Sequence, residues 1–324
     1  MPGRRCQGHS SIFVLGTADM RAASGTGRRA QGCTRLRPLG NRGIICMGLP
    51  TARRSLRRGP HVAGHRTTDV RLLLFGHMTV WVELDGVCFL TDPWFGPHGR
   101  LEHWLAPRTI PPAVDSAALS RVQALLASHH HLDHLDGFSL TLGRLLGWKV
   151  IGSAAVAARA RRAGVAEAIA LRPGQSAALG PLRVEAVPAE HPLAADAIGF
   201  LVRGSRTLYF SGDTRATAAV TGAISHPTDV ALVQAACAHY PFLGDDGMSL
   251  PEAAALLRAV RPRWSVPLHL HCSGKWLDRR TGLRIRSDNA AAVRAALGEW
   301  LGRLADEGLH GKLLEPGELW DVED

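Results

Sequence analysis

The chain has 324 residues, of which 46% are apolar, and this length supports one large folded domain or two small ones. It contains no apolar run long enough to cross a bilayer, so no membrane-spanning helix is expected. The net charge of +10 does not indicate a nucleic-acid-binding body, because residues 1–68 hold 13 Arg and one acid, whereas the remainder holds 25 basic and 27 acidic residues.

Residues 1–68 are rich in Gly, Arg, Ser and Thr, and we predict a disordered basic leader followed by a single folded domain over residues 69–324. Two alternatives stay open for the leader: a basic targeting or nucleic-acid-binding arm, and a natural start further in, for example at Met47. Its apolar stretch Ile12–Gly16 is too short for a signal-peptide core. The six Cys form no C-x-x-C pair, which argues against a disulfide framework or a Cys-based zinc site and suits a cytoplasmic protein.

The folded part opens with apolar strands predicted at Val70–Phe75, Thr79–Leu84 and Val87–Thr91. A fourth, Val122–Ala127, leads directly into a cluster of histidines. Further strands are expected at Lys149–Gly152, Leu182–Val187, Ile198–Val202, Thr207–Phe210, Val230–Val233 and Trp264–Leu268, with a strand-like tail at the end of the chain.

Helices are predicted between these strands, at Gly137–Gly147 and Ala154–Ala163. Ser249 and Glu252 form a capping box for a helix that runs through Val260. A last long helix is capped by Ser287 or Asp288 and runs to about Glu307. Strands interleaved with helices in two halves predict an α/β fold with two packed sheets and helices outside.

The strongest chemical signal is the spacing His129-x-His131-x-Asp133-His134 at the end of a buried strand. Imidazole nitrogens and carboxylate oxygens are good ligands for zinc and similar divalent ions. Packing gives no reason for so many such side chains in six positions. His130 alternates to the other side of the chain and is not counted as a ligand.

Four further metal-capable side chains follow other predicted strands: His191, Asp213, His269 and Asp92. A lone histidine at a strand end is ordinarily a packed or surface residue. These positions are interpreted as metal-site residues because the chain also contains the histidine cluster. Gly212 lets the backbone before Asp213 pass close to a site. Asp92 is placed to hold a ligating histidine by hydrogen bond.

This series resembles the metallo-β-lactamase superfamily over residues 70–320, and Asp136 extends the first motif to His-x-His-x-Asp-His-x-Asp. The short sequence segments around Asp92, Asp213 and His269 resemble those of one branch of this superfamily, the ascorbate-6-phosphate lactonase and N-acylphosphatidylethanolamine phospholipase D group. The chain departs from that branch after His269, where it continues Leu-His-Cys-Ser-Gly-Lys-Trp.

The resemblance implies a four-layer αβ/βα sandwich with two divalent metal ions at one edge of the sheets. Zinc is expected first, and manganese or iron are the alternatives. One ion would be bound by His129, His131 and His191. The other would be bound by Asp133, His134 and His269, with Asp213 bridging the two. His271 stays open as an alternative ligand to His269 or as an acid for the leaving group, and His239, Tyr240 and Lys275 are further acid candidates.

The function expected is a metal-dependent hydrolase in which Asp133 orients a metal-activated hydroxide against a small-molecule ester, lactone or phosphodiester. The principal alternative is an RNA- or DNA-processing nuclease on the same fold, which would need a basic face that residues 69–324 do not offer. A non-catalytic metal-binding member and a di-iron redox member are two more alternatives. The sequence does not indicate the oligomeric state.

Overall fold

A computed structural model describes residues 12–13, 44–45, 70–96, 108–224, 227–237, 239–240, 244–272 and 290–322. The chain divides into two units, Met1–His65 and Arg66–Asp324. In the first unit β1 (Ile12–Phe13) pairs antiparallel with β2 (Ile44–Ile45), and the rest of the predicted leader lies outside the described residues.

The second unit contains two seven-stranded sheets, each half antiparallel and half parallel. In the first sheet the strands up to β5 are antiparallel and those from β5 to β8 are parallel. Its order is β18 (Leu319–Asp321), β3 (Val70–Gly76), β4 (Thr79–Leu84), β5 (Val87–Thr91), β6 (Val122–Ala127), β7 (Lys149–Gly152) and β8 (Ala168–Ala170).

The second sheet repeats this plan, with antiparallel pairing from β9 to β12 and parallel pairing from β12 through β13 and β16 to β17. Its order is β17 (His310–Gly311), β16 (Trp264–Leu268), β13 (Val230–Gln234), β12 (Thr207–Phe210), β11 (Ile198–Arg203), β10 (Leu182–Pro188) and β9 (Ser176–Leu179). A separate ribbon pairs β14 (His239–Tyr240) with β15 (Gly244–Asp245).

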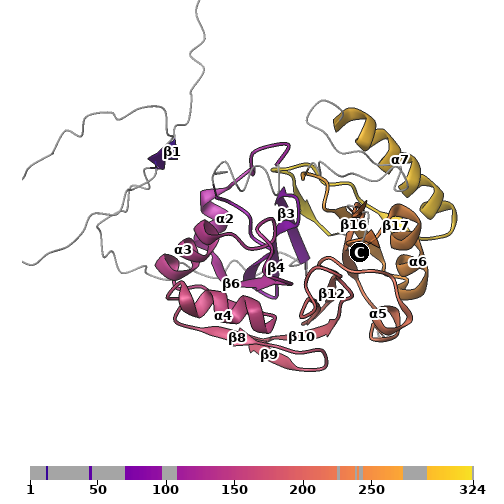
Figure 1. The fold of residues 1–324 in the computed structure, drawn as a ribbon. Coiled ribbons are helices and arrows are strands. Elements are labelled where there is room, and N and C mark those ends of the chain that lie inside the picture. The colour runs from indigo at the N-terminus through magenta and orange to yellow at the C-terminus, as the bar shows by residue number, and fades with distance from the viewer. Residues whose placement is uncertain are drawn as a thin grey trace, which may run out of the picture. The chain divides into compact units, whose positions relative to one another are not determined.

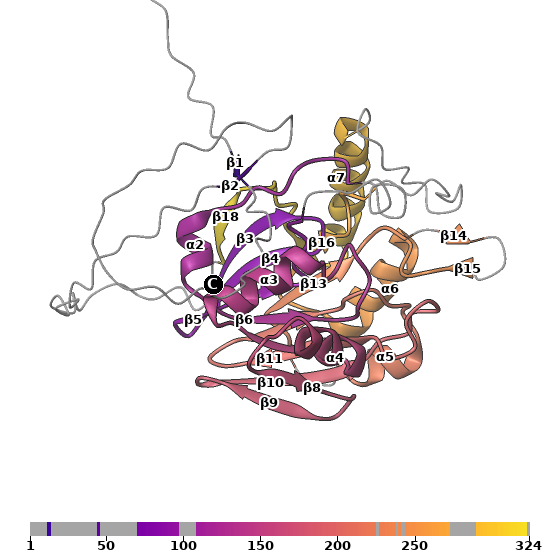
Figure 2. The ribbon, with the colours of Figure 1, turned by 60° about the vertical axis from the view of Figure 1, so that its left-hand side comes forward.

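Helices cover the outer face of each sheet, so the unit has four layers (Figures 1 and 2). The first sheet is covered by α2 (Ser116–Ser120), α3 (Gly137–Leu146) and α4 (Ala154–Arg162). The second is covered by α5 (Ala218–Gly222), α6 (Leu250–Val260) and α7 (Ala290–Asp306). The predicted αβ/βα sandwich is therefore confirmed.

Burial on both faces explains why the central strands read as continuous apolar runs. In β6, Ala124 and Leu126 pack into the core between the sheets, whereas Leu125 and Ala127 pack under the helices of the first sheet. Successive side chains of a strand point to opposite faces, so each face needs its own apolar set.

Most predicted elements match the observed ones within a residue, and the capping box of α6 is present, with Glu252 accepting the Ser249 N–H at 3.0 Å. Within residues 66–324 the prediction missed the short elements α2, α5, β8, β9, β14, β15 and β17, which have two to five residues and too little hydrophobic period to be recognised. The proposed caps of α7, Ser287 and Asp288, lie outside the described residues.

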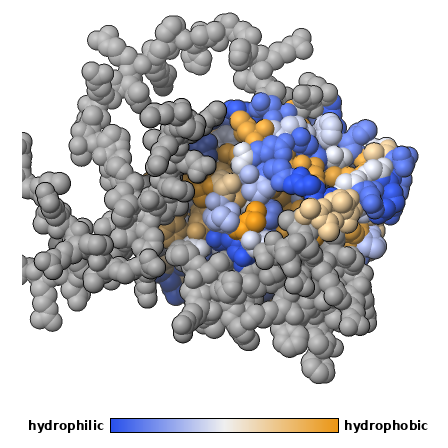
Figure 3. Space-filling model, turned by 90° about the horizontal axis from the view of Figure 1, so that it is seen from above, coloured by the Kyte–Doolittle hydropathy of each residue, from blue (hydrophilic) through white to orange (hydrophobic). Residues whose placement is uncertain are grey.

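Within the described part of the chain, no helix combines the length and apolarity needed to cross a bilayer. Figure 3 shows one face of the molecule, on which the coloured residues form small apolar patches among hydrophilic ones.

Candidate metal centre

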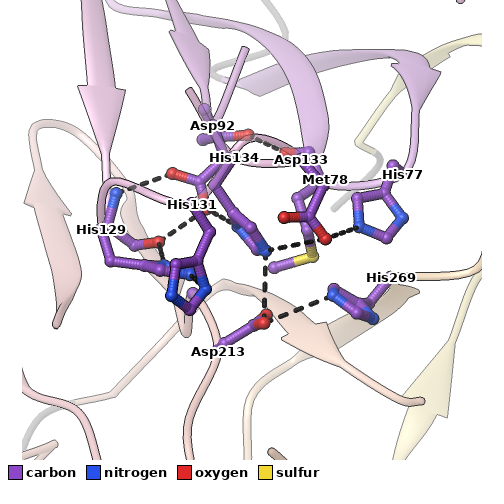
Figure 4. A network of polar contacts seen from close by, with 12 residues as sticks. His77, Met78, Asp92, His129, His131, Asp133, His134, Asp213 and His269 are labelled. Atoms are coloured by element: carbon purple, nitrogen blue, oxygen red, sulfur yellow. Dashed lines mark hydrogen bonds and ion pairs between the residues drawn. The ribbon is translucent and has the colours of Figure 1, made fainter. Parts of the chain in front are cut away.

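The metal-capable side chains follow the carboxyl ends of five strands. Asp92 follows β5, His191 follows β10, Asp213 follows β12 and His269 follows β16, while the segment 128–134 follows β6. Parallel neighbours such as β5 and β6 end at the same edge of their sheet. The topology therefore gathers residues that are far apart in the sequence (Figure 4).

A first ligand group consists of His129, His131 and His191, each offering a ring nitrogen within 4.8 Å of the others. The Nε2 of His129 lies 2.9 Å from the Nδ1 of His131, and the Nε2 of His191 lies 3.2 Å from the same atom. Nitrogens bound to one tetrahedral zinc ion would stand about 3.3–3.4 Å apart, given Zn–N bonds of about 2.0–2.1 Å. The observed spacing is close to that value.

The opposite nitrogens of these rings decide which atoms carry lone pairs. The Nε2 of His131 faces the carbonyl of Leu193 at 3.3 Å, and the Nδ1 of His191 faces the carbonyl of Asp246. A carbonyl oxygen only accepts, so these ring nitrogens donate and the inward nitrogens are unprotonated. Lone pairs that converge in this way repel one another, and a cation between them removes that repulsion.

The tautomer of His129 is set by a longer chain of hydrogen bonds. The Ser128 hydroxyl donates to Asp92 Oδ2 at 2.7 Å, so it can only accept from His129 Nδ1, which lies 3.0 Å away. The Nε2 of His129 therefore also turns a lone pair into the first ligand group. The donor set of this group fits a divalent cation.

A second ligand group brings together Asp133, His134 and His269, the set that the family resemblance implied, with the addition of His77. Asp213 lies beside this group: its Oδ2 is 3.2 Å from His134 Nε2 and 3.3 Å from His269 Nε2 (Figure 4). The other oxygen, Oδ1, is buried and has no hydrogen-bond partner among the described residues, and neither have the two facing Nε2 atoms. These buried oxygen and nitrogen atoms without hydrogen-bond partners fit a second cation.

Asp92 orients His134 of the second group by a hydrogen bond to Nδ1, the ring nitrogen opposite the one that faces Asp213. Its Oδ2 lies 2.6 Å from His134 Nδ1, and its Oδ1 accepts the Ser128 N–H at 2.7 Å. Both Asp92 and His134 are fully buried. Because His134 donates from Nδ1, the neutral ring turns the lone pair of its Nε2 toward Asp213.

The first group is electrically neutral. Burial, together with the neighbouring His134, lowers the pKa of His129 well below its usual value. Burial, with the nearby His191, lowers the pKa of His131 to about 4. Burial also lowers the pKa of His191. Neutral imidazoles are the form that binds a cation.

The second group combines carboxylates with histidines of raised basicity. Burial alone would lower the pKa of His134, but Asp213, Asp133 and Asp92 together raise it well above the usual value. Burial also favours a lower pKa for His269, but the carboxylate of Asp213 outweighs the effect of burial, so the pKa of His269 is raised. The carboxyl of Asp213 has a lowered pKa because His134 and His269 outweigh burial.

Two other histidines are neighbours of the groups without belonging to either. His130 is exposed, with Nδ1 4.0 Å from Asp196 and its ring centroid 5.4 Å from that of His131. His271 uses its Nδ1 to accept the His77 N–H at 2.8 Å and lines a small cavity with Trp94 and Arg108. The side chains of His239, Tyr240 and Lys275 lie outside the described residues. Asp136 caps α3 and accepts the Ser139 N–H at 2.6 Å.

The sequence analysis missed His77, which lies in the turn between β3 and β4. Burial, with the nearby His269, lowers its pKa to about 3. A signal was present, since His77 follows an apolar strand as the other candidates do. A two-residue hairpin turn conceals that signal, because polar residues are expected there in any case.

Comparison with known proteins supplies the family. Residues 88–270 match the model of the Beta-lactamase superfamily domain, which covers more than half of the chain. The chain is 30% identical over 200 residues to a UPF0173 protein of Pyrococcus furiosus, an alignment that covers 62% of this chain and 83% of the relative. It is 29% identical over 221 residues to a UPF0173 metal-dependent hydrolase of Opitutus terrae, covering 64% and 87%.

Solved structures agree on the fold. A possible metal-dependent hydrolase from Veillonella parvula superposes with a TM-score of 0.62 at 17% identity, over 78% of this chain and 99% of that chain. At this level of identity the likeness concerns the fold alone.

Proposed function

Starting from the fact that the chain belongs to the beta-lactamase superfamily and is a metal-dependent hydrolase, we propose that it binds two divalent cations and hydrolyses a small-molecule ester, lactone or phosphodiester. The observation that carries the proposal is the pair of adjacent ligand groups, one of three neutral histidines and one with carboxylates.

His129, His131 and His191 would hold one cation, and Asp133, His134 and His269 the other, with Asp213 between them. Imidazole-rich ligation favours zinc, and the carboxylates leave manganese and iron as alternatives. When bound, such ions lower the pKa of water from about 15.7 toward about 7 and neutralise the oxyanion that develops in the reaction.

Asp133 is the residue that we propose acts on the attacking water. Its carboxylate stays ionised, since His134 and His77 outweigh burial and lower its pKa. It is also part-exposed, unlike the fully buried His134. An ionised carboxylate at the open side of the site can orient the water and accept its proton.

The substrate class follows from charge and from the branch that the motifs resemble. Residues 69–324 are net acidic, with 25 basic and 27 acidic residues, which suits a small substrate better than a nucleic acid. Lactone and phosphodiester substrates are those of the branch that the motifs around Asp92, Asp213 and His269 resemble.

The test is elemental analysis of the purified full chain, followed by a screen against lactone, phosphodiester and β-lactam substrates. We expect two ions per chain and hydrolysis of a member of the first two classes. His130→Ala is a matched control, because this neighbouring histidine is exposed and belongs to neither ligand group. A content well below one ion per chain that added zinc or manganese does not restore would refute the proposal.

A further inference from the structure

His77 is a buried histidine at the second ligand group that is not among the proposed cation ligands. It is 2% exposed, and one of its ring nitrogens lies within 4.8 Å of ligand atoms of Asp133, His134 and His269. Its Nε2 has no hydrogen-bond partner among the described residues. A buried donor or acceptor left in this way is costly, so its position calls for an explanation.

The backbone at His77 is strained. Its φ of 55° places a non-glycine residue in the left-handed region, at a cost of roughly 1–2 kcal/mol. Among the described residues, five non-glycine positions have positive φ, and three of them, His77, Asp92 and His269, belong to this site. Such strain persists only where the surroundings over-determine the conformation, and it clusters at functional sites.

The surroundings of His77 do over-determine it. Its N–H donates to His271 Nδ1 at 2.8 Å, and the His271 N–H donates back to His77 Nδ1 at 3.3 Å. The His269 N–H donates to the carbonyl of His77 at 3.2 Å. These bonds join a turn of the first sheet to the end of β16 in the second, and they fix both the backbone and the ring of His77.

The same bonds decide which ring nitrogen carries the proton. A backbone N–H only donates, so His77 Nδ1 must accept with its lone pair, and the ring proton resides on Nε2. The arrangement is the reverse of His134 and His129, where Nδ1 donates and Nε2 turns a lone pair into the site. A protonated Nε2 cannot bind a cation, but it can donate a hydrogen bond.

The acceptor nearest to that proton is Asp133. Its Oδ2 lies 3.6 Å from His77 Nε2 and 3.9 Å from His134 Nε2 (Figure 4). If His134 holds a cation through Nε2, as proposed, that nitrogen has no proton to donate to this oxygen. In the metal-loaded protein, His77 would then be the only one of these two imidazoles that can donate to the carboxylate.

We infer that His77 is a positioning residue that donates its Nε2–H to Asp133 and sets the angle at which this carboxylate meets the cation and the attacking water. It acts through Asp133 and is not a metal ligand. The inference rests on the proposed function for its consequence in catalysis, and on the hydrogen bonds alone for its tautomer.

The first experiment reads the tautomer in the full chain labelled with ¹⁵N-histidine. In metal-free protein, the ring spectra are expected to show His77 protonated on Nε2. In protein loaded with ¹¹³Cd, coupling to the metal is expected at His134 and His269 and absent at His77. Coupling at His77, or a proton on its Nδ1, would overturn the inference.

The second experiment separates positioning from ligation with two variants. His77→Phe removes the donor, and we expect about 10–100-fold lower kcat with little change in KM and two ions still bound. His77→Gln retains a donor and should recover most of the loss, while His130→Phe serves as the control. Loss of one ion in His77→Phe would make His77 a ligand, and equal kcat in all three proteins would exclude a positioning role.

The two proposals fail in different ways. If the wild-type chain binds no cation and hydrolyses none of the substrates, the proposed function fails, whereas the metal-free spectra still test the His77 tautomer. If the wild type is an active two-metal enzyme but His77 has the other tautomer, only this inference fails.

Discussion

At the scale of single residues, the carboxylate of Asp92 organises more of the site than any ligand does. It accepts hydrogen bonds from the Ser128 N–H, the Ser128 hydroxyl and His134 Nδ1, all within 2.6–2.7 Å. Through Ser128 it also sets the tautomer of His129. One buried carboxylate therefore fixes the ring nitrogens of both proposed metal sites.

Asp92→Asn should reverse that control without changing the shape of the side chain. The amide nitrogen donates, so His134 would have to accept at Nδ1 and carry its proton on the nitrogen that faces the cation. We expect cation affinity to fall about 10–100-fold, measured by calorimetric titration of zinc into metal-free protein. Asp229→Asn, remote from the site and bonded to Thr207 and Arg206, is the control, and wild-type affinity in Asp92→Asn would contradict the assignment.

Asp133→Ala tests the group proposed to accept the proton of the attacking water. General-base catalysis contributes about 10²–10⁴-fold, so kcat/KM should fall by at least that factor while the fold is retained. Turnover, circular dichroism and the melting temperature are the measurements. Asp306→Ala changes an exposed carboxylate at the end of α7 and should leave all three unchanged. Near-normal turnover in Asp133→Ala would remove this residue from the mechanism.

At the scale of elements, the site is built from the short turns that leave the strands. Gly212, in the turn after β12, has a φ of 55°, and a Cβ placed on it would lie 2.5 Å from the Cβ of Ser128. The backbone before Asp213 thus passes directly against the turn after β6. This contact between the two sheets is what brings Asp213 beside His134.

Gly212→Ala should therefore be costly at the site and in the whole fold. The left-handed backbone alone costs about 1–2 kcal/mol with an L side chain, and the contact with Ser128 adds to it. Urea unfolding should show a loss of at least that size. Gly302→Ala offers a matched contrast: it lies within α7 with open space around it, and should stabilise by roughly 0.5–1 kcal/mol. Equal effects in the two variants would show that Gly212 is not needed for close approach.

At the scale of the whole molecule, the two sheets meet around a cluster of buried polar groups, which are the proposed cation sites. Removal of the ions with a chelator should lower stability, since a ligand at 100 times its Kd contributes about 2.7 kcal/mol. For a domain of this size we expect the melting temperature to fall by roughly 5–10 °C. Zinc should restore it, whereas calcium, which prefers oxygen ligands, should not. An unchanged melting temperature after complete removal of the metal would count against buried cation sites.

The metal-free protein should also have a stability maximum near pH 6.5. On the acid side, burial lowers the pKa of His77 to about 3 and that of His131 to about 4, so the unfolded chain binds more protons between these values and 6.5, and stability falls as the pH falls. On the alkaline side, the pKa values of His134 and His269 are raised, so their contribution is complete below 6.5 and is lost as the pH rises through the folded values.

Urea unfolding in the presence of a chelator, from pH 5 to pH 8.5, measures this dependence. Asp92 has the opposite effect on stability on the acid side, because burial raises its pKa and the folded chain then binds the extra proton. The several histidines with lowered pKa values outweigh this single group. In zinc-loaded protein the alkaline loss should disappear, since the cation takes the place of the protons. A monotonic rise in stability from pH 5 to pH 8.5 would show that the pKa values of His134 and His269 are not raised.

Much of the fold, and most of the residues that form the candidate site, could be predicted from local sequence pattern. Strand ends such as Ala127 and Leu268 are visible in the sequence because burial on both faces demands an unbroken apolar run, and a metal-capable residue directly after such a run is a local signal. The short elements α5 and β9 carry no such run, because they have only five and four residues, and for this reason they were missed.

Only the tertiary structure determined where each histidine ring nitrogen points and which of the two carries the proton. His77 and His271 are 194 residues apart, and nothing in either neighbourhood reveals that they exchange hydrogen bonds. That exchange turns His271 away from the ligand groups, so that His269 is the histidine facing Asp213, and it gives His77 a tautomer suited to donation. Spacing along a strand determines where a side chain is available, whereas contacts between the two sheets determine which of its atoms can act.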